Sequence, residues 1–209
     1  MLSLKGKGVC GGVTLGTLAV LQRETAAVKR RKVLDAEAEV ARFQAARQEA
    51  IAKLAVLYEK AVVDVGKDNA AIFEIHQMML EDLDYIESIE GIIRTQHVNA
   101  EYAVQTTAAN FAEIFSSMED DYMRARAADV KDISRKVLDC LGDGGSSWES
   151  GEGSYILAAD DLAPSETVQL DKARVQGFVT AAGSVNSHTA ILARTIGIPA
   201  GVSTGSSIG

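Results

Sequence analysis

Apolar residues between positions 24 and 97 recur at spacings of three, four or seven residues, which is typical of a helix with one buried face. The first run consists of Val33, Val40, Phe43, Ala50, Leu54 and Leu57. The second run consists of Ile72, Ile75, Met79, Leu83 and Ile86. Gly66-Lys67-Asp68-Asn69 separates the two runs, and we expect Asp68 or Asn69 to cap the second helix.

The remaining positions of this region also favour helices. Ala, Glu, Lys, Arg and Gln dominate residues 24–97, where glycine is scarce and proline is absent. Two further helices fit residues 100–118 and 121–141. The pattern therefore predicts about four helices, which suggests an antiparallel bundle.

Short apolar runs typical of buried strands lie on either side of the helical region. They occupy residues 17–21, 155–159, 175–180 and 198–202. Short helices fit residues 164–172 and 188–196. Strands and helices therefore alternate after the helical region, as they do in an α/β layer.

The early strand at residues 17–21 has no partner close to it in the sequence. It most simply joins the sheet formed after residue 150, which makes the helical region an insertion into one α/β domain. A glycine-rich connector closes the helical region. We therefore predict an α/β domain of residues 1–22 and 144–209, and a helical domain of residues 23–143.

Composition narrows the class of function. The net charge of −8 over 209 residues argues against nucleic acid and anionic membranes as main partners. The acidic excess suits either a basic protein partner or solubility alone. Cys10 and Cys140 lie far apart with no metal-ligand spacing, as expected of reduced thiols. No signal peptide or membrane-spanning run is visible, so we expect a cytoplasmic protein.

A histidine opens the last predicted helix. Asn186 or Ser187 is a good N-cap, which places His188 in the first turn. Unpaired N–H groups and the positive end of the helix dipole favour an anion there, and a neutral imidazole is a nucleophile. By itself this pattern fits either a phosphoryl carrier or an ordinary capped helix.

Several segments together resemble one family. Ser187–Arg194, followed by Gly197–Ala200, resembles the phosphohistidine signature of the phosphoenolpyruvate-utilising enzymes. That family includes Enzyme I of the bacterial sugar phosphotransferase system, pyruvate phosphate dikinase and phosphoenolpyruvate synthase. Ala71–Asp82 and Arg126–Ile133 resemble blocks of Enzyme I, and Gly6–Gly16 is similar to the glycine-rich opening of the family. The resemblance covers essentially the whole chain.

The resemblance to Enzyme I implies a swivelling phosphohistidine α/β domain with an inserted antiparallel four-helix bundle that binds the carrier protein HPr. His188 would receive phosphate from phosphoenolpyruvate, held with magnesium on a C-terminal domain, and pass it to a histidine of HPr. We expect this chain to be an N-terminal fragment, monomeric and without a cofactor of its own, whereas the whole enzyme dimerises through the C-terminal domain.

Two alternatives stay open. One is a regulatory paralogue that binds a partner but has altered acceptor activity. The other is a fragment of pyruvate phosphate dikinase or phosphoenolpyruvate synthase, which the docking-like segment at residues 71–82 disfavours.

The motifs suggest roles for individual residues. By resemblance, Thr167 contacts the ring of His188 and orients it, and Arg194 is placed to pair with phosphate oxygens. The carrier-binding surface would comprise Glu74, His76, Met78, Met79, Glu81, Asp82, Asp84 and Arg126. The ordinary alternatives are a helical threonine, a solvated arginine and a solvated acidic helix face.

Two histidines and two methionines need separate expectations. His76 either makes a polar contact at a helix kink or lies in a plain helix interface, and His97 caps the end of a helix. We expect one of Met78 and Met79 to be buried and the other exposed, because two adjacent helical positions face different directions.

The chain departs from the family pattern at three positions. Ser184 and Asn186 replace the second glycine and the threonine of Gly-Gly-x-Thr-Ser-His. Both tolerate tight turns, so we expect the acceptor to be retained. Ala163 replaces the threonine of the capping box Thr-Pro-Ser-Glu and cannot accept its hydrogen bond. We therefore expect an unsatisfied N–H where the helix carrying Thr167 begins, unless water or Asp161 serves it.

Overall fold

The computed structural model describes residues 5–21, 28–142, 153–183 and 187–205, apart from the side chain of His188. Contacts divide the chain into two compact units, which are described separately. The α/β unit contains Met1–Glu24, Lys60–Ala70 and Ser147–Gly209, and the helical unit contains Thr25–Glu59 and Ala71–Ser146. Residues 60–70, which the sequence pattern places in the helical domain, thus group with the sheet.

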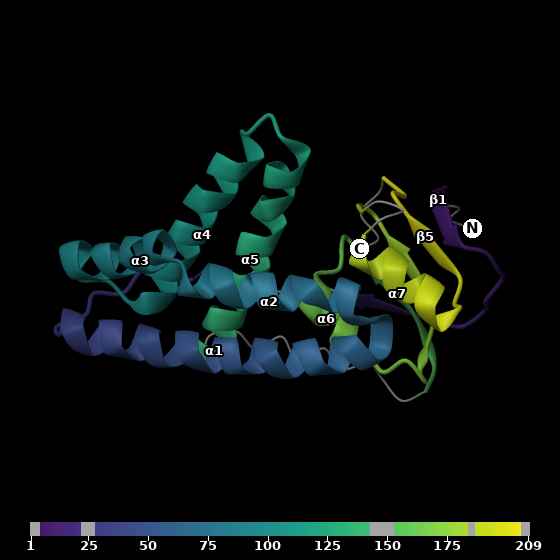
Figure 1. Ribbon diagram of the computed structural model, residues 1–209, viewed down its shortest axis with the longest axis horizontal. Helices are drawn as coiled ribbons and strands as arrows, with labels where there is room; N and C mark the ends of the chain where they lie inside the picture. Colours follow the sequence, from purple (N-terminus) through teal and green to yellow (C-terminus); the bar gives the residue numbers. More distant parts are fainter. Residues whose placement is uncertain (1–4, 22–27, 143–152, 184–186, 206–209) are drawn as a thin grey trace. The chain divides into compact units, whose positions relative to one another are not determined.

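The α/β unit is built on a five-stranded sheet in the order β1-β5-β4-β3-β2 (Figure 1). The strands are β1 (Lys7–Cys10), β2 (Thr17–Leu21), β3 (Tyr155–Ala159), β4 (Val175–Thr180) and β5 (Ala200–Val202). β2 to β5 run parallel, and β1 is antiparallel to β5. The expected joining of residues 17–21 to the later strands is confirmed, with Thr17 opposite Tyr155. β1 is an additional strand that the sequence pattern did not predict.

The glycine-rich opening crosses the sheet from one edge to the other. β1 and β2 lie at opposite edges, so the segment between them passes the starts of β5 and β4. Gly12 has φ +143°, and an added Cβ would lie 2.8 Å from Pro199. An added Cβ at Gly177 would lie 3.0 Å from Thr14. Glycine is therefore required where this segment approaches the sheet.

Two helices pack with the sheet around one apolar core. They are α6 (Pro164–Gln169) and α7 (His188–Ile196), and the core includes Leu157, Phe178 and Leu192. α7 has the expected limits. α6 ends before residue 172, because Leu170 adopts an extended backbone with ψ 142° and its side chain joins the core. β5 begins after Pro199, which has no N–H to donate to a neighbouring strand.

Five helices, instead of about four, form the inserted region in the described residues. They are α1 (Ala36–Val65), α2 (Lys67–Glu81), α3 (Leu83–Gln96), α4 (Ala100–Ser116) and α5 (Asp121–Leu141) (Figure 1). The extra helix arises because the second apolar run is interrupted at Asp82. Asp82 has ψ 128°, and its carboxylate accepts a hydrogen bond from the N–H of Tyr85 at 3.1 Å.

The chain reverses between α1 and α2 within one residue, Gly66. Its φ of +85° is a left-handed conformation, and α2 begins at Lys67. The expected cap at Asp68 or Asn69 is therefore wrong, because both residues lie inside the first turn of α2. The side chain of Asn69 instead donates to the carbonyl of Val65 at 2.8 Å. The expected cap at the end of α3 is confirmed, since His97 is its C-cap with φ 50°.

A buried polar cluster joins α1 to the start of α4. Glu101 is 2% exposed and accepts hydrogen bonds from Arg42 at 2.7 Å and Asn99 at 2.8 Å. Burial alone raises the pKa of Glu101, but these bonds outweigh it and hold the pKa below its usual value. The carboxylate therefore stabilises the folded state above its unfolded pKa, and that stabilisation is lost as pH falls through the folded pKa.

Apolar side chains fill the rest of the helical unit. Those that are almost fully buried include Phe43, Leu54, Phe73, Leu80, Ile89, Ile93 and Ile133. Among the described residues, no helix is both long enough and apolar enough to cross a membrane.

Two glycines test the backbone argument in opposite directions. Gly66→Ala should lower the free energy of unfolding by about 1 kcal/mol, because an L-residue is strained at positive φ. Gly91 lies inside α3 with no atom near its added Cβ, so Gly91→Ala should raise stability by about 0.5–1 kcal/mol. Urea denaturation measures both. A loss of stability in both variants would contradict the argument.

Candidate functional site

The signature histidine is the first residue of α7. Ser187 is the N-cap, with φ −66° and ψ 160°, and its hydroxyl accepts from the N–H of Ala190 at 3.3 Å. Of the two caps that the sequence allowed, the structure thus uses Ser187. The His188 side chain lies outside the described residues, as do Ser184 and Asn186 with their departures from the family pattern. The position of His188 is defined by its helix.

The turn that leads toward His188 is held at the carboxyl ends of the parallel strands. The N–H of Ala182 donates to the carbonyl of Asp160, just beyond β3, at 2.7 Å. The hydroxyl of Ser203, just beyond β5, donates to the carbonyl of Gly183 at 2.7 Å. Ligand sites of open α/β sheets lie at this edge. The signature helix therefore begins where such a sheet usually carries its chemistry.

Thr167 lies on α6, which packs against α7. The residue is 3% exposed, and its hydroxyl donates to the carbonyl of Pro164 at 2.8 Å. The hydroxyl proton is thus committed to the backbone, while the lone pairs of the oxygen can accept a second hydrogen bond. This is the polarity needed to receive a ring N–H.

Thr189 is a residue that the sequence reasoning missed. It follows His188 directly, is 1% exposed, and its hydroxyl has no hydrogen-bond partner in the described part of the chain. A buried hydroxyl without a partner is uncommon and marks the start of α7 as polar. In the sequence, only its position directly after His188 could have marked Thr189 as a residue of the site.

Arg194 is exposed and lies six positions after His188 on α7. Six residues advance a helix by about 9 Å and turn it to about 120° from the starting direction. The two positions therefore lie on different faces of α7. The helix geometry adds no support for a direct contact between Arg194 and a phosphate on His188.

The helix that carries Thr167 begins where the capping box predicts. Ala163 is the N-cap with φ −71° and ψ 155°, and its N–H donates to the carboxylate of Glu166 at 2.7 Å. The N–H of Glu166 donates to the carbonyl of Ala163 at 3.1 Å. The expected unsatisfied N–H is therefore wrong at this position, because a tight turn supplies a backbone acceptor.

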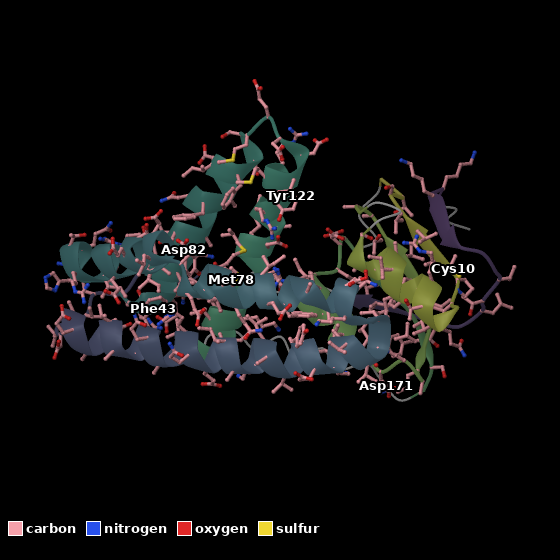
Figure 2. The ribbon with its side chains drawn as sticks, in the orientation of Figure 1. Cys10, Phe43, Met78, Asp82, Tyr122 and Asp171 are labelled. Atoms are coloured by element: carbon pink, nitrogen blue, oxygen red, sulfur yellow. The ribbon has the colours of Figure 1, made fainter. Side chains whose placement is uncertain are left out.

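The predicted docking segment presents acidic and apolar side chains to solvent. Glu74, Glu81, Asp82 and Asp84 are exposed. Met78 is 68% exposed, whereas Met79 is half-buried and not fully buried as expected. Figure 2 shows Met78 on α2 and Asp82 where α2 ends.

His76 faces the core, although the sequence reasoning placed it on the partner-binding surface. It is fully buried, with Nε2 3.3 Å from a carboxylate oxygen of Asp129 and Nδ1 3.7 Å from one of Asp132. Of the two expected settings, the structure favours a polar contact, made between α2 and α5. The contact holds these two helices together beneath the exposed Met78.

Arg126 extends this contact to the surface. Its guanidinium lies 3.1 Å from the other oxygen of Asp129 and 4.5 Å from the ring centre of Tyr122, to whose hydroxyl it also donates. Tyr122 is 64% exposed and was missed from the sequence (Figure 2). The sequence feature that could have identified Tyr122 is its position as an aromatic residue directly after Asp120 and Asp121, at the start of a helix.

Two further observations concern metal ligands and thiol chemistry. Within residues 5–21, 28–142, 153–183 and 187–205, no three His, Cys, Asp or Glu side chains gather as metal ligands would. The described residues therefore do not form a site that fits magnesium. Burial raises the pKa of the Cys140 thiol, which favours its protonated form.

Comparison with known proteins gives a consistent result. The family model "PEP-utilising enzyme, N-terminal" matches residues 5–126, and "PEP-utilising enzyme, mobile domain" matches residues 151–208. A phosphoenolpyruvate-protein phosphotransferase of Bacillus sp. (strain S) is 38% identical over 203 residues, covering 97% of this chain and 35% of that protein. The one from Bacillus subtilis (strain 168) is 36% identical, covering 100% and 37%. The chain thus spans about a third of the length of these relatives.

Solved structures agree with the fold. An NMR solution structure of an Enzyme I protein has a TM-score of 0.75 and 32% identity, covering 98% of this chain and 84% of that one. A structure titled "N-terminal domain of Enzyme 1 - Nitrogen" has a TM-score of 0.66 and 26% identity, covering 96% and 83%. The α/β fold with a helical insertion is therefore confirmed.

The cap of α6 can be improved by one substitution. Ala163→Thr should raise the free energy of unfolding by about 0.5–1 kcal/mol, because a hydroxyl at an extended N-cap accepts from the first turn. Ala163→Val has a similar shape without the hydroxyl and is the control. Denaturant melts compare the two variants. An equal gain from valine would show that capping is not the cause.

Proposed function

The chain belongs to the phosphoenolpyruvate-utilising enzymes, and on that premise we propose that it supplies the phosphohistidine and carrier-docking parts of a phosphoenolpyruvate-protein phosphotransferase. The observation that carries the proposal is His188 at the capped start of α7, at the carboxyl edge of a parallel sheet. The order of the two family models along the chain supports it. The remainder of the relatives' length would hold phosphoenolpyruvate and any magnesium.

The proposed reaction has two phosphoryl transfers. A ring nitrogen of His188 attacks the phosphorus of phosphoenolpyruvate, so that a P–N bond forms as the P–O bond breaks. The released enolate takes up a proton and becomes pyruvate. A histidine nitrogen of the carrier protein then attacks the same phosphorus, and the P–N bond to His188 breaks. Such transfers depend on positioning and charge stabilisation more than on covalent chemistry by the protein.

Thr167 is proposed to orient the acceptor. Its hydroxyl already donates to Pro164, so its oxygen is available to accept the N–H of the imidazole. That bond would leave the other ring nitrogen unprotonated and able to attack. The first-turn N–H groups of α7 would stabilise phosphate oxygens. Arg194 is proposed only to add positive charge near the site, since it lies on another face of the helix.

The carrier is proposed to dock on the helical unit. We define the docking surface as the exposed residues Glu74, Met78, Glu81, Asp82, Leu83, Asp84 and Tyr122. Exposed apolar side chains together with carboxylates suit a partner that presents both apolar and basic side chains, as proposed here for HPr. His76, Met79 and Arg126 would support this surface from beneath or at its edge.

The remaining features of the proposal concern the whole protein. We propose that residues 1–22 and 144–209 act as the mobile α/β domain, residues 23–143 as the docking domain, and the cytoplasm as their location. This chain would be a monomer with no cofactor, and dimerisation would belong to the remainder of the enzyme. A regulatory paralogue would keep the docking surface but carry no transferable phosphate.

The acceptor can be tested directly. This chain should take up labelled phosphate from phosphorylated HPr, and His188→Ala should abolish the uptake because it removes the attacking nitrogen. His97→Asn keeps a helix C-cap and is the control. Autoradiography and acid lability of the label provide the measurement. Full labelling of His188→Ala would overturn the assignment, and no labelling of the unmodified chain would favour the regulatory paralogue.

The docking surface can be tested by charge reversal. Glu81→Lys combined with Asp84→Lys should weaken binding of HPr about tenfold or more and reduce its salt dependence, because attraction to a basic rim becomes repulsion. Glu49→Lys combined with Glu59→Lys makes the same change of net charge on α1 and is the control. Titration calorimetry at two salt concentrations compares them. Equal weakening by both pairs would place the interface elsewhere.

A further inference from the structure

A groove lies between α3 and α4, two helices of the helical unit that pack against each other (Figure 1). Its volume is about 360 Å³, which is within the range of small-molecule sites in proteins. Gly91 of α3 leaves part of this space open, because an added Cβ there would meet no atom within 4 Å. Glycine is intrinsically unfavourable inside a helix, so the open space comes at a cost in helix stability.

Thr107 of α4 lines this groove and carries a buried hydroxyl group without a partner. The residue is 1% exposed, and its Oγ1 makes no hydrogen bond to any of the described residues. A helical threonine can satisfy its hydroxyl on the carbonyl four residues earlier, as Thr95 does by donating to Gly91 at 2.6 Å. Thr107 does not make that bond. Because a buried hydroxyl without a partner is unfavourable, this group is available to a ligand that supplies one.

The rest of the groove combines apolar and acidic side chains. Ile92 and Phe111 are half-buried, and the ring of Phe111 makes an edge contact with Tyr85 at 6.1 Å between ring centres. Glu87 is exposed and contributes a negative charge. No lysine or arginine is among the described residues that line the groove. The groove therefore disfavours anions, phosphate esters included, and favours a cation attached to an apolar body.

We propose that the groove between α3 and α4 binds a small amino alcohol, which is an aliphatic molecule with a hydroxyl group and a protonated amine. The hydroxyl of the ligand pairs with the free hydroxyl of Thr107. Its aliphatic body lies against Ile92 and Phe111, in the space that Gly91 leaves open. Its ammonium group faces the carboxylate of Glu87. This site takes no part in phosphoryl transfer and goes beyond the proposed function.

Four small probes test the chemistry of the ligand. 4-Amino-1-butanol should bind the unmodified chain with a Kd on the order of 1–10 mM. Butan-1-ol and butylammonium each lack one polar group and should bind about fivefold more weakly, and butyrate should not bind because it is an anion. In titrations followed by amide NMR, the shifts should concentrate at Gly91, Thr107 and Asn110. Equal binding of butyrate, or shifts elsewhere in the chain, would overturn the proposal.

Removal of the free hydroxyl tests its role. Thr107→Val keeps the shape of the side chain and should weaken binding of 4-amino-1-butanol about fivefold, while binding of butylammonium stays unchanged. The variant should fold as well as the unmodified chain, because it removes a buried polar group that has no described partner. Thr106→Val is the matched control, since Thr106 is half-buried on α4 and does not line the groove. Equal effects of the two substitutions would contradict the proposal.

Two further variants test the charge and the space. Glu87→Gln should weaken binding of butylammonium about threefold and leave binding of butan-1-ol unchanged, with the exposed Glu113→Gln as its control. Gly91→Leu keeps a good helix former in α3 but fills the groove, so it should weaken binding of all three binding probes about tenfold or more. Ala109→Leu adds a leucine at an exposed position of α4 outside the groove and is its control. Unchanged binding in Gly91→Leu would place the probes elsewhere and reject the site.

These results are independent of the phosphate assay. If no probe binds the unmodified chain, the groove holds only water and this site is rejected, whether or not His188 takes up label. If no probe binds but Gly91→Leu weakens binding of HPr, the groove is a contact for the carrier and the small-molecule site is likewise rejected. Specific binding of the probes by a chain that takes up no label would leave this site standing and reject the proposed function.

Discussion

The parallel pairing of β2 with β3 is the constraint on which the rest of the fold depends. Thr17 lies opposite Tyr155 and Leu21 opposite Ala159, so the chain must leave one end of the sheet and return to the other. Parallel strands require a crossover connection, and here the five helices α1–α5 lie within it. β2 is an edge strand, which lets this long insertion leave the sheet without crossing another strand.

The same sheet organises the candidate site. Because β3, β4 and β5 run parallel, the turns that follow them meet at one edge, where Ser203 and Asp160 hold the turn that leads toward His188. The glycine-rich opening passes the other end of the sheet, where β4 and β5 start, and so lies away from this turn. The chemistry and the chain crossing are thus separated by the length of the strands. Thr167 reaches the site side on α6, which packs directly on α7.

Charged side chains have two different roles within the helical unit. In the helical unit, Glu101 is buried and accepts bonds from Arg42 and Asn99, which fixes the start of α4 against α1. On the docking surface the carboxylates are exposed and contribute little to stability, so they are free to set the charge that a partner meets. His76 and Asp129 connect these roles, since they join α2 to α5 directly beneath that surface. The proposed function therefore needs the insertion for docking and the sheet for chemistry.

Local patterns in the sequence were sufficient for most elements. They determine the limits of α7, the α5 helix and the strands β2, β3 and β4, because these depend on residues that are neighbours in the chain. The cap of α7 was narrowed to Asn186 or Ser187, and the structure uses Ser187. The signature around His188 is equally local. Even the joining of β2 to the later strands followed from the absence of any nearer partner.

Tertiary structure decided what depends on distant segments. His76 lies on the buried face of α2 with Phe73 and Leu80. Its partners Asp129 and Asp132 come from α5, which no pattern within α2 could reveal. The break at Asp82 uses a cap that competes with a continuous apolar run, and Arg47 of α1 stabilises it by donating to the carbonyl of Leu80 at 2.9 Å. β1 is too short and too rich in glycine to be recognised as a strand from the sequence. It forms because it can pair with β5. Contacts of this kind form only once the chain is folded, which is why the sequence alone determined most elements and the acceptor signature, but not β1, the break at Asp82 or the side chains that support the site.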